Sequence, residues 1–189
     1  NVTIQSNTVA TANTKATAGI GIYNRAYNGG DVTQTLTIDA NSIADGFQAG
    51  INLEEIASNG GFVGQSLGIT NNSIGAARYV GIGFYARANS GGDISQGGAV
   101  SGNVVAGQTA VKGAGLWSTI YASEGGGGVT VTQSLVLTNN NFSGNTGDGM
   151  FLSAQANGGA DVLQNLSLSG NVIDGNGDDG VHALAFNAG

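Results

Sequence analysis

The chain alternates apolar and polar residues over short stretches, and similar stretches return at regular intervals. From Val32 to Ile38, every second residue is apolar or Gln, and the residues between them are threonines. A period of two indicates a β-strand with one buried face rather than a helix. No apolar stripe at helical spacing persists, so we expect helices to be absent or confined to a cap.

Two polar residues mark the repeat. In five copies a Gln is followed seven residues later by an Asn, and an apolar residue comes two positions after that Asn. The Gln anchors are Gln34, Gln65, Gln96, Gln133 and Gln164, and the Asn anchors are Asn7, Asn41, Asn72, Asn103, Asn140 and Asn171. Successive Asn anchors are separated by 34, 31, 31, 37 and 31 residues. Such self-similarity is typical of a solenoid, in which each repeat forms one turn.

A glycine opens another apolar stretch in each repeat. These glycines are Gly19, Gly50, Gly81, Gly115, Gly149 and Gly180. Each repeat then supplies three short strands: one before the Asn, one just after it and one after the Gly. We therefore predict an all-β, parallel β-helix of about six coils of 31–37 residues, in which residues 1–189 form a single domain.

Stacked coils superpose equivalent side chains at a spacing of about 4.8 Å. The Asn anchors should then lie in one column, each at a bend where Asn tolerates a left-handed backbone. Each amide can bond to the equivalent amide one coil away. The Gln anchors share the apolar face and need the same arrangement, because an unpaired interior amide costs about 1–3 kcal/mol.

The repeats and their turns carry a family resemblance. Turns such as Asn-Thr-Gly-Asp-Gly at 145–149 and Asn-Gly-Asp-Asp-Gly at 176–180 precede apolar strands. The chain thus resembles right-handed parallel β-helix proteins of the pectate-lyase-like superfamily and the related secreted adhesins and autotransporter passengers. The resemblance implies right-handed coiling, which parallel crossovers generally share, and an extracellular or cell-surface location. No polar or helical cap is evident at either end, so we expect a fragment of a longer β-helix or a stacking unit.

Composition excludes several classes of partner. The chain has 12 acidic and 5 basic side chains, a net charge of −7, and only 9% charged residues. Such a surface attracts nucleic acid and anionic lipid weakly, so we expect neither as a partner. No apolar run of about 18 residues is present, which excludes a membrane-spanning helix. Without cysteine, neither a disulfide nor a thiolate metal site can form.

Aromatic and Arg side chains form the candidate binding surface. If the alternation holds, one exposed sheet carries Tyr23, Arg25, Tyr85, Arg87, Trp117, Tyr121 and Phe151. Exposed aromatics with Arg commonly mark an interaction surface, which here would suit sugar stacking, a protein partner or lateral packing. The alternative is that loops cover these side chains or that they are scattered cross-strand pairs.

Acidic turns form a second candidate site. Asp148, Asp174, Asp178 and Asp179 fall in equivalent or neighbouring turns, with His182 close by and Lys112 one coil earlier. The resemblance to pectin-degrading β-helices implies glycoside hydrolysis or calcium-assisted elimination for such groups. The candidate ligands of a calcium ion are Asp148, Asp178 and Asp179. However, Gly-Asp-Gly is also ordinary turn chemistry, and the family's other catalytic segments are missing, so we assign no catalytic residue.

Together these observations favour a non-catalytic, extracellular structural or adhesive β-helix segment without a cofactor. We expect it to self-associate end to end or laterally, in a filament or surface fibre, with carbohydrate as a further candidate partner. The alternative is a polysaccharide-active lyase, hydrolase or epimerase that uses the acidic turns. A serine triad is disfavoured, because the chain has one His and no Gly-x-Ser-x-Gly segment.

Overall fold

The computed structural model is a parallel β-solenoid, described for residues 1–10, 16–45, 47–123 and 128–188. Three sheets run the length of the solenoid, and every strand pair in them is parallel. The described residues contain no helix, and therefore none that could cross a membrane. The predicted all-β fold of about six coils is confirmed.

Five coils contribute three strands each in the predicted order, and the last described coil contributes two, with an isolated bridge at Val172 in place of its sheet-B strand. Sheet A comprises β1 (Val2–Gln5), β4 (Asp31–Asp39), β7 (Phe62–Thr70), β10 (Asp93–Ser101), β13 (Thr130–Thr138) and β16 (Asp161–Ser169). Sheet B comprises the short strands β2 (Thr8–Val9), β5 (Ser42–Ile43), β8 (Ser73–Ile74), β11 (Val104–Ala106) and β14 (Asn141–Ser143). Sheet C comprises β3 (Ala18–Tyr27), β6 (Ala49–Ser58), β9 (Val80–Asn89), β12 (Ala114–Ser123), β15 (Met150–Asn157) and β17 (Val181–Ala188).

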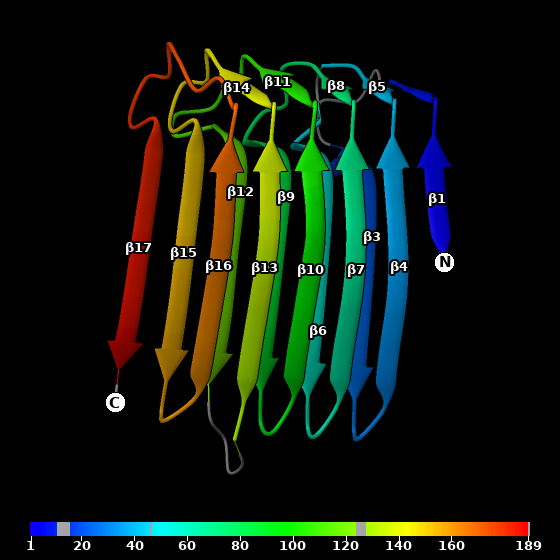
Figure 1. The fold of residues 1–189 in the computed structure, drawn as a ribbon, viewed down its shortest axis with the longest axis vertical. Helices are drawn as coiled ribbons and strands as arrows, with labels where there is room; N and C mark the ends of the chain where they lie inside the picture. Colours follow the sequence, from blue (N-terminus) through cyan, green and yellow to red (C-terminus); the bar gives the residue numbers. More distant parts are fainter. Residues whose placement is uncertain (11–15, 46, 124–127, 189) are drawn as a thin grey trace.

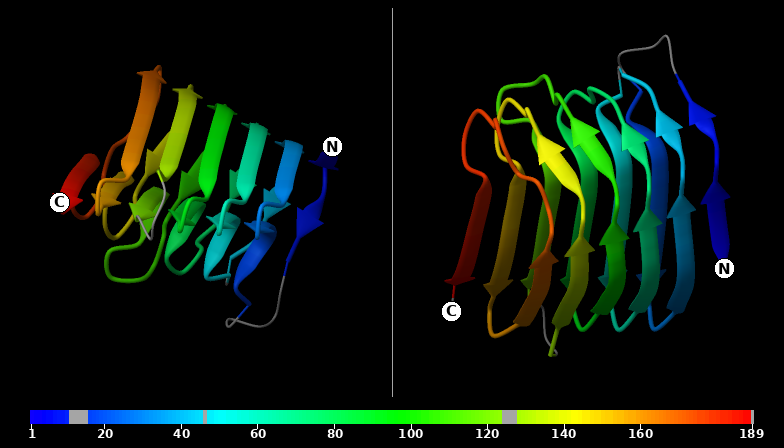
Figure 2. Two further views of the ribbon diagram at one scale, coloured as in Figure 1. Left: turned by 90° about the horizontal axis from the view of Figure 1, so that it is seen from below. Right: turned by 45° about the horizontal axis from the view of Figure 1, so that its top comes forward.

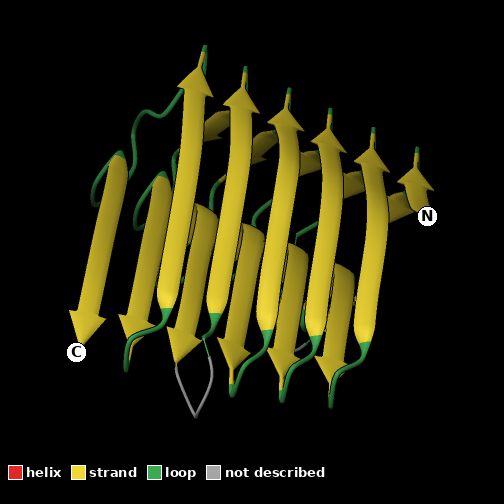
Figure 3. Ribbon diagram, turned by 60° about the horizontal axis from the view of Figure 1, so that its bottom comes forward, coloured by secondary structure: helices red, strands yellow, loops and turns green. Residues whose placement is uncertain are grey.

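Figure 1 shows the winding sense of the coils. The strands of sheet A run upward in front, the chain crosses at the top, and the strands of sheet C run downward behind. Successive coils advance from right to left, so the solenoid is right-handed, as expected. Sheet B lies where sheet A gives way to sheet C (Figure 2, right), whereas short turns join sheet C back to sheet A (Figure 3).

Two clusters of apolar side chains fill the interior. Large side chains such as Ile38, Phe84 and Phe142 belong to the cluster beside sheet B. The second cluster lies close to the turns that join sheets C and A and consists mainly of small residues, among them Ala57 and Ala88. Small side chains allow the two sheets to approach each other there, which the short turns require.

The six Asn anchors form one hydrogen-bonded column. Asn41 is typical: its Nδ2 donates to Asn72 Oδ1 at 2.9 Å and to the backbone carbonyl of Ile4 at 2.9 Å. Its backbone N–H also donates to Asn72 Oδ1, at 3.0 Å. From Asn41 onward each side-chain oxygen accepts a backbone N–H and each amide nitrogen donates to a backbone carbonyl, so exchanging the amide oxygen and nitrogen would break these bonds.

The left-handed bend lies one residue earlier than expected. The residues before the anchors have φ between 53° and 64°; they are Ser6, Ala40, Asn71, Gly102, Asn139 and Gly170. The prediction that the ladder Asn itself adopts this conformation was therefore wrong. The preceding residue makes the turn, and the Asn can then point inward to satisfy the backbone groups that the bend leaves unpaired.

The five Gln anchors form a second interior column with the opposite donor direction. Nε2 of Gln65 donates to Gln34 Oε1 at 2.8 Å, and Nε2 of Gln133 donates to Gln96 Oε1 at 2.6 Å. Donors thus point toward the N-terminal coil here, whereas they point toward the C-terminal coil in the Asn column. The first Gln is completed by Asn24, whose Nδ2 donates to Gln34 Oε1 at 3.1 Å.

Candidate binding surface on sheet C

The outer face of sheet C carries three rows of superposed side chains. Strand register places Asn52, Gly83, Trp117, Phe151 and His182 in the first row. The second row holds Tyr23, Glu54, Tyr85, Thr119 and Ser153, and the third holds Arg25, Ile56, Arg87, Tyr121 and Gln155. All seven residues predicted to share one exposed sheet therefore lie on sheet C.

The aromatic side chains of the first row stack on one another. The rings of Trp117 and Phe151 lie 4.1 Å apart at an angle of 30°, and His182 meets Phe151 edge-on at 5.3 Å. Trp117 Nε1 donates to Thr119 Oγ1 at 2.8 Å. Such contacts fix the indole, so its free face is presented without further ordering.

Three of the remaining predicted residues take part in two separate pairs. Arg25 makes an ion pair with Glu54 at 2.8 Å, and the hydrogen bond and charge of Glu54 raise the pKa of the Arg25 guanidinium. Arg87 lies over the Tyr121 ring at 5.6 Å from its centre. Tyr23 lies at the N-terminal end of the sheet, three coils from Trp117.

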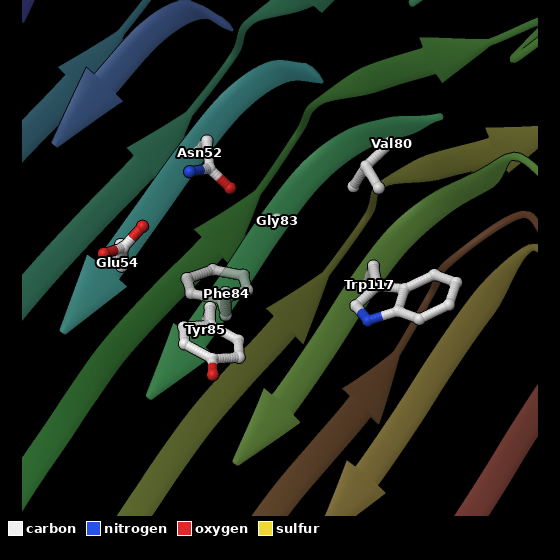
Figure 4. Close-up of a pocket in the computed structure, with 7 residues that line it drawn as sticks. All are labelled: Asn52, Glu54, Val80, Gly83, Phe84, Tyr85 and Trp117. Atoms are coloured by element: carbon white, nitrogen blue, oxygen red, sulfur yellow. The ribbon is translucent and has the colours of Figure 1, made fainter. Parts of the chain in front are cut away.

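A shallow hollow lies beside Trp117. It has a volume of about 370 Å³ and is lined by Asn52, Glu54, Val80, Gly83, Phe84, Tyr85 and Trp117. Figure 4 shows Asn52 and Glu54 of β6 on one side and Trp117 of β12 on the other, with Gly83 and Tyr85 of β9 between them. The hollow exists because Gly83 has no side chain where the next two coils carry Trp117 and Phe151.

A second hollow, of about 330 Å³, also borders Trp117. Its lining is Tyr79, Val80, Val111, Lys112 and Trp117, and Val111 is 90% exposed. Arg78 lies over the Tyr79 ring at 5.0 Å. The sequence analysis did not assign these residues to the aromatic surface, although a signal was present: Gly115 follows Asn103 by 12 residues, against 9 in the coils on either side, and the extra length carries Val111 and Lys112.

The structure brings together only part of the predicted acidic site. Asp148, Asp179 and His182 each place a potential ligand atom within 4.8 Å of the other two. Asp174 and Asp178 are not part of this group, although they precede Asp179 in the same turn. Neither hollow at Trp117 includes any of these residues.

One carboxyl group that sequence reasoning overlooked lies inside the coil. Glu55 is 0% exposed, and neither of its carboxyl oxygens has a hydrogen-bond partner among the described residues. Burial raises the pKa of Glu55 to about 8, and the nearby Gln96 amide acts in the opposite direction. The signal was its position, because Glu55 has the same parity as the interior residues Ile51 and Leu53.

Comparison of the chain with protein families, curated proteins and solved structures finds no match.

Proposed function

We propose that this chain is a non-catalytic, adhesive segment of an extracellular β-helix protein, and that the hollow beside Trp117 binds a sugar ring of a neutral polysaccharide. The observation that carries the proposal is the arrangement of that hollow: an immobilised indole on one side, an amide and a carboxylate on the other, and a glycine floor between them. The kinship with secreted adhesins that the repeats suggest is part of the proposal.

The dimensions of the hollow suit a pyranose ring. Trp117 and Asn52 are separated by one intervening strand, so their strands lie about 10 Å apart. A ring over Gly83 can place its apolar face against the indole and its hydroxyl groups toward Asn52 and Glu54. Small-ligand sites typically combine an apolar surface with a small number of well-positioned polar groups. The volume of this hollow, about 370 Å³, falls at the small end of the range of such sites.

Charge favours a neutral polymer over an acidic one. The chain carries a net charge of −7, and Glu54 on the rim would repel a uronic acid. The guanidinium of Arg25, which contacts the rim residue Glu54, is already paired with that carboxylate at 2.8 Å. Pectin and alginate are therefore poorer candidates than uncharged hexose polymers.

Calorimetric titration with cello-, manno- and galacto-oligosaccharides tests the proposal. We expect one of them to bind, and to change the emission of Trp117, the single Trp of the chain. Trp117→Ala should weaken binding at least tenfold, or about 1.4 kcal/mol, and Gly83→Val should weaken it by filling the hollow. Tyr27→Ala is the matched control, because Tyr27 is exposed on the same sheet but outside the hollow. Equal affinity in the wild type and Trp117→Ala, or no binding at all, would refute the proposal.

Self-association belongs to the same proposal, since an adhesive β-helix can pack laterally or end to end in a fibre. If packing is lateral, a second copy of the chain would compete with the sugar for the aromatic face. Light scattering of the wild type and Trp117→Ala distinguishes sugar from a second copy of the chain as the occupant of this face. If the substitution dissolves an assembly that added sugar leaves intact, the face makes protein contacts instead.

The enzymatic alternative is favoured by one observation, the close approach of Asp148 and Asp179 beside His182. Two carboxylates near a titratable side chain are the groups that a hydrolase, lyase or epimerase needs. Incubation with pectin, alginate and neutral glycans, followed by measurement of unsaturated and reducing ends, tests it. Turnover that Asp179→Ala abolishes would overturn the non-catalytic proposal.

A further inference from the structure

Two carboxylates and an imidazole converge where the last two described coils begin their sheet-C strands. Asp148 and Asp179 are 31 residues apart and occupy equivalent turns. The backbone N–H of Asp179 donates to Asp148 Oδ1 at 3.0 Å, and that of Gly149 donates to the carbonyl of Asp179 at 2.9 Å. The stacking of the coils therefore holds the two acidic side chains next to each other.

His182 supplies a third donor of a different kind. Its Nδ1 lies 3.4 Å from Asp179 Oδ2 and 3.8 Å from Asp148 Oδ2. Strand register sets His182 beside Phe151, and the edge-on contact between the two rings at 5.3 Å orients the imidazole. The nitrogen that faces the carboxylates is thus held there by packing on the aromatic row.

Asp148 directs one carboxylate oxygen toward His182. Its side chain is only 10% exposed. Oδ1 accepts the hydrogen bond from Asp179, but no described residue donates a hydrogen bond to Oδ2, which points toward His182 at 3.8 Å. A carboxylate oxygen that faces an imidazole nitrogen and a second carboxylate, and that no donor among the described residues occupies, is free to bind a cation.

From this geometry we propose that Asp148, Asp179 and His182 bind a first-row divalent metal ion of the Zn²⁺ type. Two ligand atoms that are bound about 2.1 Å from zinc at tetrahedral angles lie about 3.4 Å apart. That matches the separation of His182 Nδ1 and Asp179 Oδ2, and rotation of the Asp148 carboxylate closes the remaining gap.

The donor set also selects the ion. One imidazole nitrogen with two carboxylate oxygens suits zinc and its neighbours, whereas calcium prefers an all-oxygen shell of six to eight ligands. The candidate calcium ligand Asp178 lies outside the group, so His182 takes its place as the third ligand. Three protein ligands leave a coordination position for water, and the bound ion would tie the turns of two successive coils together.

The single His of the chain makes the test direct. Tag-free protein is stripped of metal with a chelator and titrated with Zn²⁺, Mn²⁺ and Ca²⁺. We expect Zn²⁺ to bind at one site per chain, to shift the imidazole signals of His182 in NMR spectra and to raise Tm. His182→Ala should weaken Zn²⁺ binding at least tenfold, and Asp179→Asn should act in the same direction. Asp178→Asn, a neighbouring carboxylate outside the group, should leave Zn²⁺ affinity unchanged.

Three results would overturn the assignment. Equal Zn²⁺ affinity in the wild type and His182→Ala would place the metal elsewhere. A larger rise in Tm with Ca²⁺ than with Zn²⁺ would indicate an oxygen-only site. Imidazole signals that respond to pH but not to Zn²⁺ would mean that protonated His182 itself bridges the two carboxylates.

Discussion

The buried carboxyl group of Glu55 should make the solenoid less stable as pH rises. In the folded protein Glu55 holds its proton up to about pH 8, whereas the unfolded chain releases it near the ordinary value of 4.5. Between these values the folded state binds more protons than the unfolded state, so increasing pH favours unfolding. Stability is therefore highest below about pH 4.5 with respect to this group, and the loss is complete above about pH 8.

The size of the effect follows from the same interval. Each pH unit between the two pKa values corresponds to about 1.4 kcal/mol, so the whole interval from 4.5 to about 8 represents about 5 kcal/mol. The structure gives the physical cause: Glu55 lies between Asn24 and Ala86 in the strand register and is fully buried, and neither carboxyl oxygen has a hydrogen-bond partner among the described residues. An ionised Glu55 carboxylate at this position would lose its hydration shell and gain few hydrogen bonds in return, which is energetically costly.

Glu55→Gln isolates this contribution. The variant keeps the shape of the side chain but cannot ionise, so its stability should lack the downward slope of the wild type between pH 4.5 and 8. Chemical unfolding at half-unit pH steps, followed by far-UV circular dichroism and by the emission of Trp117, gives both free energies of unfolding. Their difference should change by about 5 kcal/mol across the interval, in favour of Glu55→Gln at high pH.

The adjacent residue supplies the control for this experiment. Glu54 is partly exposed and paired with Arg25, so Glu54→Gln should change the pH dependence by less than about 1 kcal/mol. Parallel pH profiles for the wild type and Glu55→Gln would show that Glu55 is hydrated or hydrogen-bonded in solution, and the account of its burial would fail.

Two further stability predictions concern the coil interior. Gln96→Leu should destabilise by less than Gln96→Glu, because the first leaves two amides short of one bond each, whereas the second buries another carboxyl group near Glu55; equal melting temperatures would contradict this. Gly98→Ala should cost about 2 kcal/mol or more, because a Cβ there would lie 1.9 Å from the carbonyl oxygen of Leu67 at a φ of 151°. Gly97→Ala is its control, since the added Cβ would meet only the Ser134 carbonyl oxygen at 3.5 Å, and a similar loss in both variants would refute the steric explanation.

The coil could be predicted from spacing and alternation. Residues such as Gln34 and Gln65, which recur 31 positions apart, can superpose only if the intervening chain makes one circuit. Alternation then divides each strand into an inner and an outer side, which placed Gln in the interior and Trp117 outside. These properties are local or periodic, and they depend on no contact between distant parts of the chain.

Prediction was less reliable where a single residue matters. The left-handed bend was assigned to the ladder Asn rather than to Ala40 or Asn71 before it, because Asn tolerates that conformation and the pattern does not show where the chain turns. Glu55 went unnoticed although its parity places it inside, since a carboxyl group contradicts the expected apolar face.

The sites themselves were decided by packing between coils. Repeat spacing could not reveal that Gly83 opens a hollow between Asn52 and Trp117, because that depends on which side chains are missing from neighbouring coils. Nor could it show that His182 joins Asp148 and Asp179 while Asp178 does not, since rotamers and turn geometry set those distances. The linear pattern specifies the circuit and the side of each strand, whereas the contacts that carry chemistry form only when the turns have been stacked.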